Sequence, residues 1–176
     1  MDVVYDLASG LDHLIPSPQY SGSLKYNTEA EYDSLVWMDA RTKPSYTAAV
    51  TATLDVMRQY ISDQIDIKTE YEIENSLVTT LDTSAYIHAT REWQFNALNI
   101  YMQRATAFVT YPYALGVSYG FDGTVTYLTL TDATDVETLY SEMFAHVKGW
   151  LDSGRTLKNG LASLTKEQLL AYEDNR

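Results

Sequence analysis

The stretch from Asp82 to Leu151 decides the fold: DTSAYIHAT REWQFNALNI YMQRATAFVT YPYALGVSYG FDGTVTYLTL TDATDVETLY SEMFAHVKGW L. Its first part carries apolar residues at the spacing that places side chains on one helical face, namely Ile87, Phe95, Leu98, Met102, Ala105 and Val109. A second apolar set, beginning at Trp93, makes this face wider than one partner helix covers. We expect a long helix that ends at Tyr111-Pro112 and is either central in the fold or shared with another chain.

Two runs of alternating residues follow this helix, over 115–120 and 125–130. They are rich in β-branched and aromatic residues, and they flank Phe121-Asp122-Gly123. An Asp-Gly pair between two such runs favours a tight turn. The sequence therefore predicts an antiparallel β-hairpin.

A second amphipathic helix is predicted after the hairpin. Thr131, Asp132 and Thr134 are residue types that cap helices, and Glu137 stands three residues after Thr134. We expect this helix to stop at Gly154. Its apolar face consists of Val136, Leu139, Tyr140, Met143, Val147, Trp150 and Leu151.

The composition limits the classes of partner. Among 176 residues, 24 acids face 12 bases, and the formal charge of −12 opposes binding to nucleic-acid phosphates. Cysteine is absent, so there is no disulfide, thiolate or Cys-zinc site. No apolar run is long enough to cross a bilayer, and the acidic N-terminus is unlike a secretory signal. Fifteen tyrosines suit either contact surfaces or the borders of strands and helices.

Residues 1–44 are expected to form an extended docking arm with one short helix. Glycines, prolines and serines interrupt any period, yet the segment is too apolar for a solvated tail. Such a segment lies either along its own domain or along a neighbouring subunit. The capping-box pattern Thr28-Glu29-Ala30-Glu31 predicts a short helix to about Leu35.

Residues 45–81 are expected to form a middle helical segment, and residues 82–176 the helix-hairpin-helix domain. The middle segment carries an apolar seam, and its acidic part over 63–74 favours a helix over a strand. Short helices should follow Gly154, the last of them begun by the capping-box pattern Thr165-Lys166-Glu167-Gln168. The predicted fold class is α+β, predominantly α, with an irregular N-terminal arm and short C-terminal helices.

No group of residues indicates catalysis, a metal or a cofactor. Glu142 and His146 are four residues apart on a helix, but a metal site needs further ligands, so a solvated pair is the better interpretation. Ser163 and Lys166 match the spacing of some acyl enzymes without their companion motifs. The three tryptophans leave a carbohydrate-binding module as an alternative function. We therefore predict no enzyme and expect no small-molecule substrate.

Several short motifs stand in the C-terminal part of the chain, namely Phe121-Asp122-Gly123-Thr124, Leu128-Thr129, Trp150-Leu151, the run over 157–162 and Thr165-Lys166-Glu167-Gln168-Leu169. A further motif spans the junction from Leu35 to Ser45. Together they resemble an uncharacterised domain family that recurs in tailed bacteriophages, often in tail, tail-fibre or fibre-assembly proteins. The resemblance implies a role in the virion or its assembly, and the family has no established catalytic residues to transfer.

The prediction is a structural protein of a tailed-phage virion, at the tail, baseplate or fibre attachment. It would be made in the host cytoplasm and would bind other virion proteins and itself, as a symmetric oligomer, without nucleic acid or membrane. A dissociable tail-fibre assembly chaperone is the main alternative. The predicted protein-contact residues are Val4, Tyr5, Leu14, Ile15, Tyr20 and Tyr26 of the arm and Val50, Leu54, Met57 and Ile61 of the middle helix.

Overall fold

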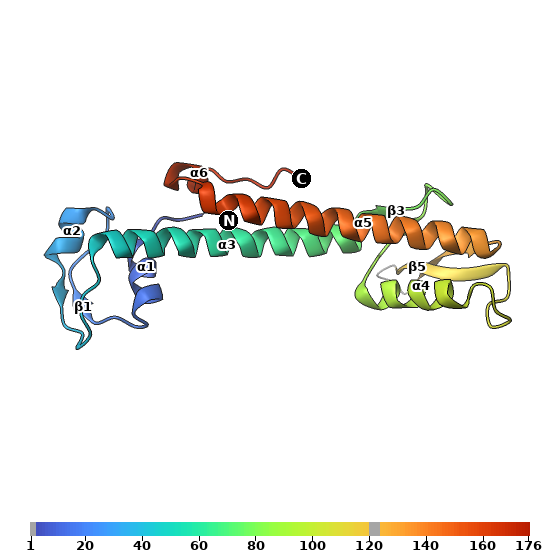
Figure 1. Cartoon of the computed structure of the whole chain (residues 1–176), viewed down its shortest axis with the longest axis horizontal. Helices are drawn as coiled ribbons and strands as arrows, with labels where there is room; N and C mark the ends of the chain where they lie inside the picture. Colours follow the sequence, from blue (N-terminus) through green and yellow to red (C-terminus); the bar gives the residue numbers. More distant parts are fainter. Residues whose placement is uncertain (1–2, 120–123) are drawn as a thin grey trace. The chain divides into compact units, whose positions relative to one another are not determined.

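The computed structural model describes residues 3–119 and 124–176 (Figure 1). It is a predominantly helical α+β fold with short antiparallel strand pairs, which confirms the predicted class. The elements are α1 (Leu7–Leu14), β1 (Tyr20–Ser21), α2 (Glu29–Ser34), β2 (Val36–Trp37), α3 (Tyr46–Asn75), β3 (Leu77–Val78), β4 (Tyr86–Ile87), α4 (Arg91–Gln103), β5 (Tyr113–Tyr119), β6 (Val125–Leu130), α5 (Ala133–Gly160), the 3-10 helix η1 (Leu161–Ser163) and α6 (Lys166–Leu170).

The chain forms two compact units. Unit 1 comprises Met1–Ile65 and Leu157–Arg176, and unit 2 comprises Asp66–Thr156. This grouping differs from the three consecutive segments expected from the sequence, because the C-terminal residues belong with the N-terminal ones. The bounds 1–44, 45–81 and 82–176 therefore do not coincide with either unit.

Unit 2 is built around the hairpin of β5 and β6, which lies between α4 and the first part of α5 in Figure 1. Alternate residues of the two strands point into one apolar cluster, so the predicted period of two is confirmed. The predicted turn at Phe121-Asp122-Gly123 lies outside the described residues. The buried cluster consists of Leu77, Ala85, Ile87, Ala89, Trp93, Ala97, Leu115, Val117, Leu128, Leu130, Val136, Leu139 and Met143.

The helix predicted to begin near Asp82 is shorter than expected. Ile87 belongs to β4 and pairs with Leu77 of β3, so a strand pair occupies the start of the predicted helix. Helix α4 begins only after Thr90, whose side chain accepts a hydrogen bond from the amide of Trp93 at 3.3 Å. It ends at Gln103, well before Tyr111-Pro112, and turns follow. Burial of Ile87 in a cross-strand pair therefore outweighs its helical spacing.

In unit 1, the N-terminal segment packs onto its own unit. Leu7 and Leu11 of α1, four residues apart, are both fully buried with Tyr32 of α2 and Ala49 of α3. The side chain of Asn27 fixes the entry to α1, accepting a bond from the amide of Leu7 at 2.8 Å and donating to the carbonyl of Tyr5 at 3.2 Å. Of the two alternatives open for this segment, the structure supports packing along its own domain.

The middle of unit 1 is the N-terminal part of α3. Met57, Ile61 and Ile65 recur at steps of four and pack against Leu161 of η1 and Leu169 of α6. The seam therefore continues past Ile61, where the sequence pattern weakens. The acid-rich part of the segment is helical through Asn75, as predicted.

The C-terminal helices are partly as expected. Helix α5 begins after Asp132, whose carboxylate accepts bonds from the amides of Thr134 and Asp135. It does not stop at Gly154, which is buried within it, but continues to Gly160. Packing thus outweighs the low helix propensity of glycine, about 1 kcal/mol relative to alanine. The capping boxes at Thr28 and Thr165 are both present.

Candidate functional site

The predicted contact residues of the N-terminal segment differ in exposure. Val4 and Tyr26 are each 70 % exposed and Leu14 is also exposed. Tyr5, Ile15 and Tyr20 are partly buried. Tyr5 lies under the ammonium of Lys166 at 3.6 Å from the ring centroid, and Tyr20 stacks on Trp37 with centroids 6.3 Å apart. Only the exposed members of this set remain open to another protein in unit 1 as it is folded.

The predicted contact residues of the middle helix are used inside unit 1. Met57 and Ile61 are buried in the unit's own core, and Val50 and Leu54 pack partly against it. The expectation that Met57 and Ile61 contact another protein is therefore wrong for this fold. The reason is that η1 and α6 cover the seam.

Unit 2 instead leaves an apolar face open on α4 and the turns after it. Phe95 is 61 % exposed and Met102 is 67 % exposed, and they stand seven residues apart on one side of the helix. Leu98, between them, is partly buried, and Phe108 in the following turns is 87 % exposed. Large aromatic and methionine side chains at this exposure are typical of protein-contact surfaces. This face, defined by Phe95, Leu98, Met102 and Phe108, is called the α4 face below.

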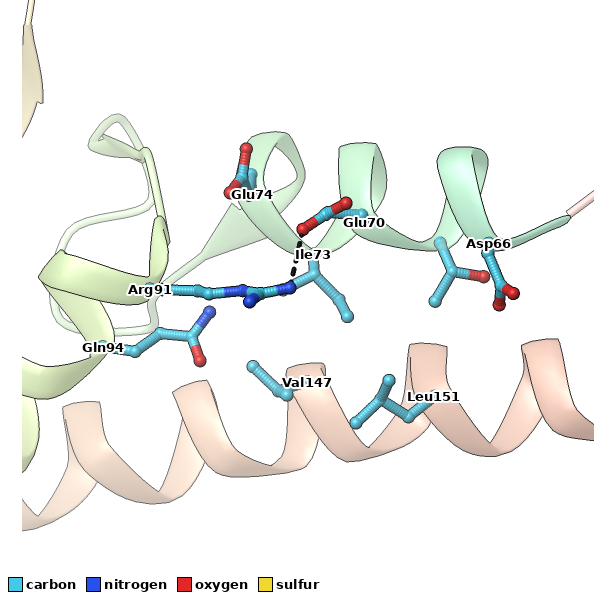
Figure 2. Close-up of a pocket in the computed structure, with 9 residues that line it drawn as sticks. Asp66, Glu70, Ile73, Glu74, Arg91, Gln94, Val147 and Leu151 are labelled. Atoms are coloured by element: carbon cyan, nitrogen blue, oxygen red, sulfur yellow. Dashed lines mark hydrogen bonds and ion pairs between the residues drawn. The ribbon is translucent and has the colours of Figure 1, made fainter. Parts of the chain in front are cut away.

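Unit 2 also holds a cavity of about 370 Å³ between three helices (Figure 2). That volume lies within the range of about 300–1,000 Å³ that ligand pockets occupy. The lining residues are Asp66, Thr69, Glu70, Ile73 and Glu74 of α3, Arg91 and Gln94 of α4, and Val147 and Leu151 of α5.

Helical spacing places these lining residues together. On α3 the acids Asp66, Glu70 and Glu74 stand four residues apart, so successive turns present them on one side. Val147 and Leu151 repeat the same step on α5 and face Ile73 across the cavity in Figure 2. The acids therefore form a rim above an apolar floor.

The rim contains one internal ion pair. The guanidinium of Arg91, in the first turn of α4, contacts the carboxylate of Glu70 at 3.0 Å, and Figure 2 shows the side chain reaching from α4 towards α3. The amide of Gln94 donates to the carbonyl of Ala89 at 2.7 Å, which keeps its side chain at the start of α4. No ion pair is recorded for Glu74 among residues 3–119 and 124–176. Acidic groups thus exceed the one basic group in the cavity.

Glu142 and His146 each make hydrogen bonds to other parts of unit 2 beside this cavity. They are therefore not the solvated pair predicted from the sequence. The carboxylate of Glu142 accepts bonds from the hydroxyl of Thr79 at 2.7 Å and from the hydroxyl and amide of Thr80. The Nε2 atom of His146 lies 3.2 Å from the carbonyl oxygen of Glu72 and 3.3 Å from that of Ile73. Because both carbonyls are acceptors, Nε2 donates and satisfies carbonyls at the end of α3.

The remaining candidates for chemistry are dispersed. In unit 1, His13 lines a second cavity with Asp6 and Asp12, whereas His88 in unit 2 packs edge-on against Tyr86. Trp93 is buried and donates to the carbonyl of Gly116 at 2.9 Å, so it is closed to a sugar. Across the part of the chain that the structure describes, no three potential ligands gather into a metal site. Nor, in that part, does any helix have the length and apolarity to span a bilayer.

One signal in the sequence could have indicated the cavity, although it was not used in the prediction. The spacing of the three acids on α3 is visible in the sequence, and the helix itself was predicted. The position of Arg91 was not predicted. The expected helix began near Asp82, which placed Arg91 in the interior of a helix and not in its first turn. No local pattern relates Val147 to Ile73, which are far apart in the chain.

No family model, curated protein or solved structure matches the chain. The resemblance to the tailed-phage family therefore stays a prediction.

Proposed function

We propose that this chain works by binding other proteins, as a structural component of a tailed-phage particle at its tail, baseplate or fibre attachment. The resemblance of the C-terminal motifs supplies the setting. The exposed apolar side chains of unit 2 supply the means, since burying such groups drives association between proteins.

The observation that carries the proposal is the α4 face. Phe95 and Met102 project from the same side of α4 and are mostly exposed, although the opposite side of this helix buries Trp93 and Ala97. A helix whose two sides are both apolar suits a second partner beyond its own core. Phe108, in the turns that follow α4, is more exposed than either.

The test removes this face without disturbing the core. A double variant, Phe95→Ser with Met102→Ser, should fold as stably as the parent, because both side chains are exposed. Its copy number in purified particles should fall at least about tenfold, because buried aromatic anchors dominate interface energies. Quantitative mass spectrometry of purified particles measures this loss.

The matched control is Ile67→Ser, an exposed apolar residue of α3 outside the α4 face. It should be incorporated like the parent. Normal incorporation of the double variant would contradict the role of the α4 face. Absence of the parent chain from mature particles would contradict the structural role and favour the dissociable assembly chaperone.

Deleting residues 1–26 is a poor test of docking by the N-terminal segment. It removes Leu7 and Leu11 from the core of unit 1, so the remainder loses buried area as well as any contact surface. Substitution of the exposed Val4 and Tyr26 by serine leaves that core intact and tests the same contact.

A further inference from the structure

The cavity of unit 2 offers two kinds of surface at once. Ile73 is buried in its floor, with Val147 and Leu151 opposite, while the carboxylates of Glu70 and Glu74 stand at its rim. A neutral apolar ligand would make no use of the carboxylates at the rim, and a small hydrated cation would make no use of the apolar side chains. The combination fits a positive group carried on an apolar stem.

Arg91 already shows which chemical group the rim accepts. Its guanidinium binds Glu70 while its stem crosses the cavity beside Ile73 (Figure 2). The side chain of Arg91 is nevertheless 88 % exposed, and that of Glu70 is 60 % exposed. Exposed ion pairs of this kind are weak, so Arg91 can yield its place to another cation.

We propose that this cavity binds an arginine or lysine side chain of a protein partner, with an apolar neighbour of that residue on Val147 and Leu151. The inference rests on the proposed function in that the partner is a protein. The incoming cation displaces Arg91 from Glu70 and is shared between Glu70 and Glu74. Arg91 thus acts as an internal competitor that weakens binding.

The charge of the whole molecule favours the same class of partner. A formal charge of −12 attracts basic segments at long range and repels acidic ones. The apolar floor then adds selectivity for a basic residue that has an apolar neighbour. A free metal ion lacks the apolar part, and a phosphate group lacks both the positive charge and the apolar part.

The test uses the full chain, labelled with ¹⁵N, titrated with the peptide acetyl-Leu-Arg-Leu-amide. Amide shifts should concentrate on the lining residues of the cavity. A peptide with neutral citrulline in place of arginine, which keeps the shape and removes the charge, should bind more weakly. Higher salt should weaken the arginine peptide more than the citrulline peptide.

Two substitutions should move the affinity in opposite directions, which a general loss of folding cannot do. Glu74→Gln should weaken binding by about two- to fivefold, as expected for loss of an exposed charge pair. Arg91→Ala should tighten binding by about two- to fivefold, because it removes the competitor. The matched controls are Glu92→Gln, an exposed acid outside the cavity, and Lys25→Ala, which removes an exposed positive charge from unit 1.

Equal binding of the arginine and citrulline peptides would overturn the proposal, as would shifts centred outside the cavity or weaker binding by Arg91→Ala. These failures differ from a failure of the proposed function. If the chain is present in particles but its cavity ignores the peptide, only the partner chemistry is wrong. If the cavity binds as described but the chain is absent from particles, only the structural role is wrong.

Discussion

The two units differ in how completely they bury the apolar face of a central helix. In unit 1, the apolar seam of α3 is covered by the chain's own ends, with α1 at one part of the helix and η1 and α6 at another. In unit 2, the hairpin and α5 cover one side of α4, and its α4 face stays open. An apolar seam in a sequence therefore marks a surface that needs a partner, without indicating whether that partner is the same chain.

The largest expected effect tests how closely unit 1 is packed. A Cβ atom at Gly10 would stand 2.2 Å from Oγ1 of Thr53 and 2.6 Å from the carbonyl oxygen of Ala49. Gly10→Ala should therefore force α1 away from α3 and lower the free energy of unfolding by about 3 kcal/mol. Chemical denaturation measures the loss, and amide hydrogen exchange should locate it in unit 1.

Gly149→Ala is the matched control in unit 2. Apart from the neighbouring residues of the helix itself, nothing lies within 4 Å of a Cβ at this position of α5, so alanine should stabilise the helix by up to about 1 kcal/mol. If Gly10→Ala were as stable as the parent, the close approach of α1 to α3 would be refuted, and with it the self-covered seam of unit 1.

A smaller effect tests the polar contact that holds the chain after α3 in unit 2. Glu142→Ala leaves the buried hydroxyl of Thr79 and the amide of Thr80 without their acceptor. The expected cost is about 2 kcal/mol, the usual penalty for unsatisfied buried polar groups. Thermal unfolding measures it. Thr80→Ala removes one exposed donor only and should cost less, whereas equal costs would mean that the Thr79 contact contributes nothing.

The smallest effect is a pH dependence at the start of α5. The hydroxyl and amide of Thr131 hold the pKa of Asp135 below its ordinary value of 3.8. A lowered folded-state pKa means that Asp135 stabilises the fold above pH 3.8 and that this stability is lost as pH falls through the folded-state pKa. Asp135→Asn should therefore reduce stability at pH 6 and flatten the acid limb of the stability curve. An unchanged acid limb in urea titrations would count against the Thr131 contact.

Local signals predicted the local parts of both units. The capping boxes at Thr28 and Thr165 need only residues within one turn, and the strands of the hairpin need only their own alternation. The pairing of Leu77 with Ile87 escaped prediction, because each strand is two residues long and helical spacing at Ile87 gave a competing pattern. The continuation of α5 past Gly154 was not predicted, because the burial of this glycine in the fold is not visible in the local sequence.

The candidate site also has a part that local sequence could predict and a part that it could not. The acids of α3 belong to one helix, so their spacing in the sequence could have indicated that they share one side of it. Arg91 stands near them because β3 and β4 pair and return the chain to α3, and the apolar side chains opposite Ile73 come from α5. The seam residues Met57 and Ile61 were predicted to contact another protein, whereas the segment that covers them belongs to the same chain. It stands about a hundred residues later, at Leu161 and Leu169.

His146 fixes the carbonyl of Ile73, and the side chain of Ile73 forms the floor of the cavity in unit 2. Glu142, one turn earlier on α5, anchors the residues that leave α3. The backbone beneath the cavity is thus preorganised before any ligand arrives, so binding orders only the arriving side chain and the displaced Arg91. Because little of the protein has to be ordered on binding, a site with few contacts loses less of its binding free energy to conformational entropy.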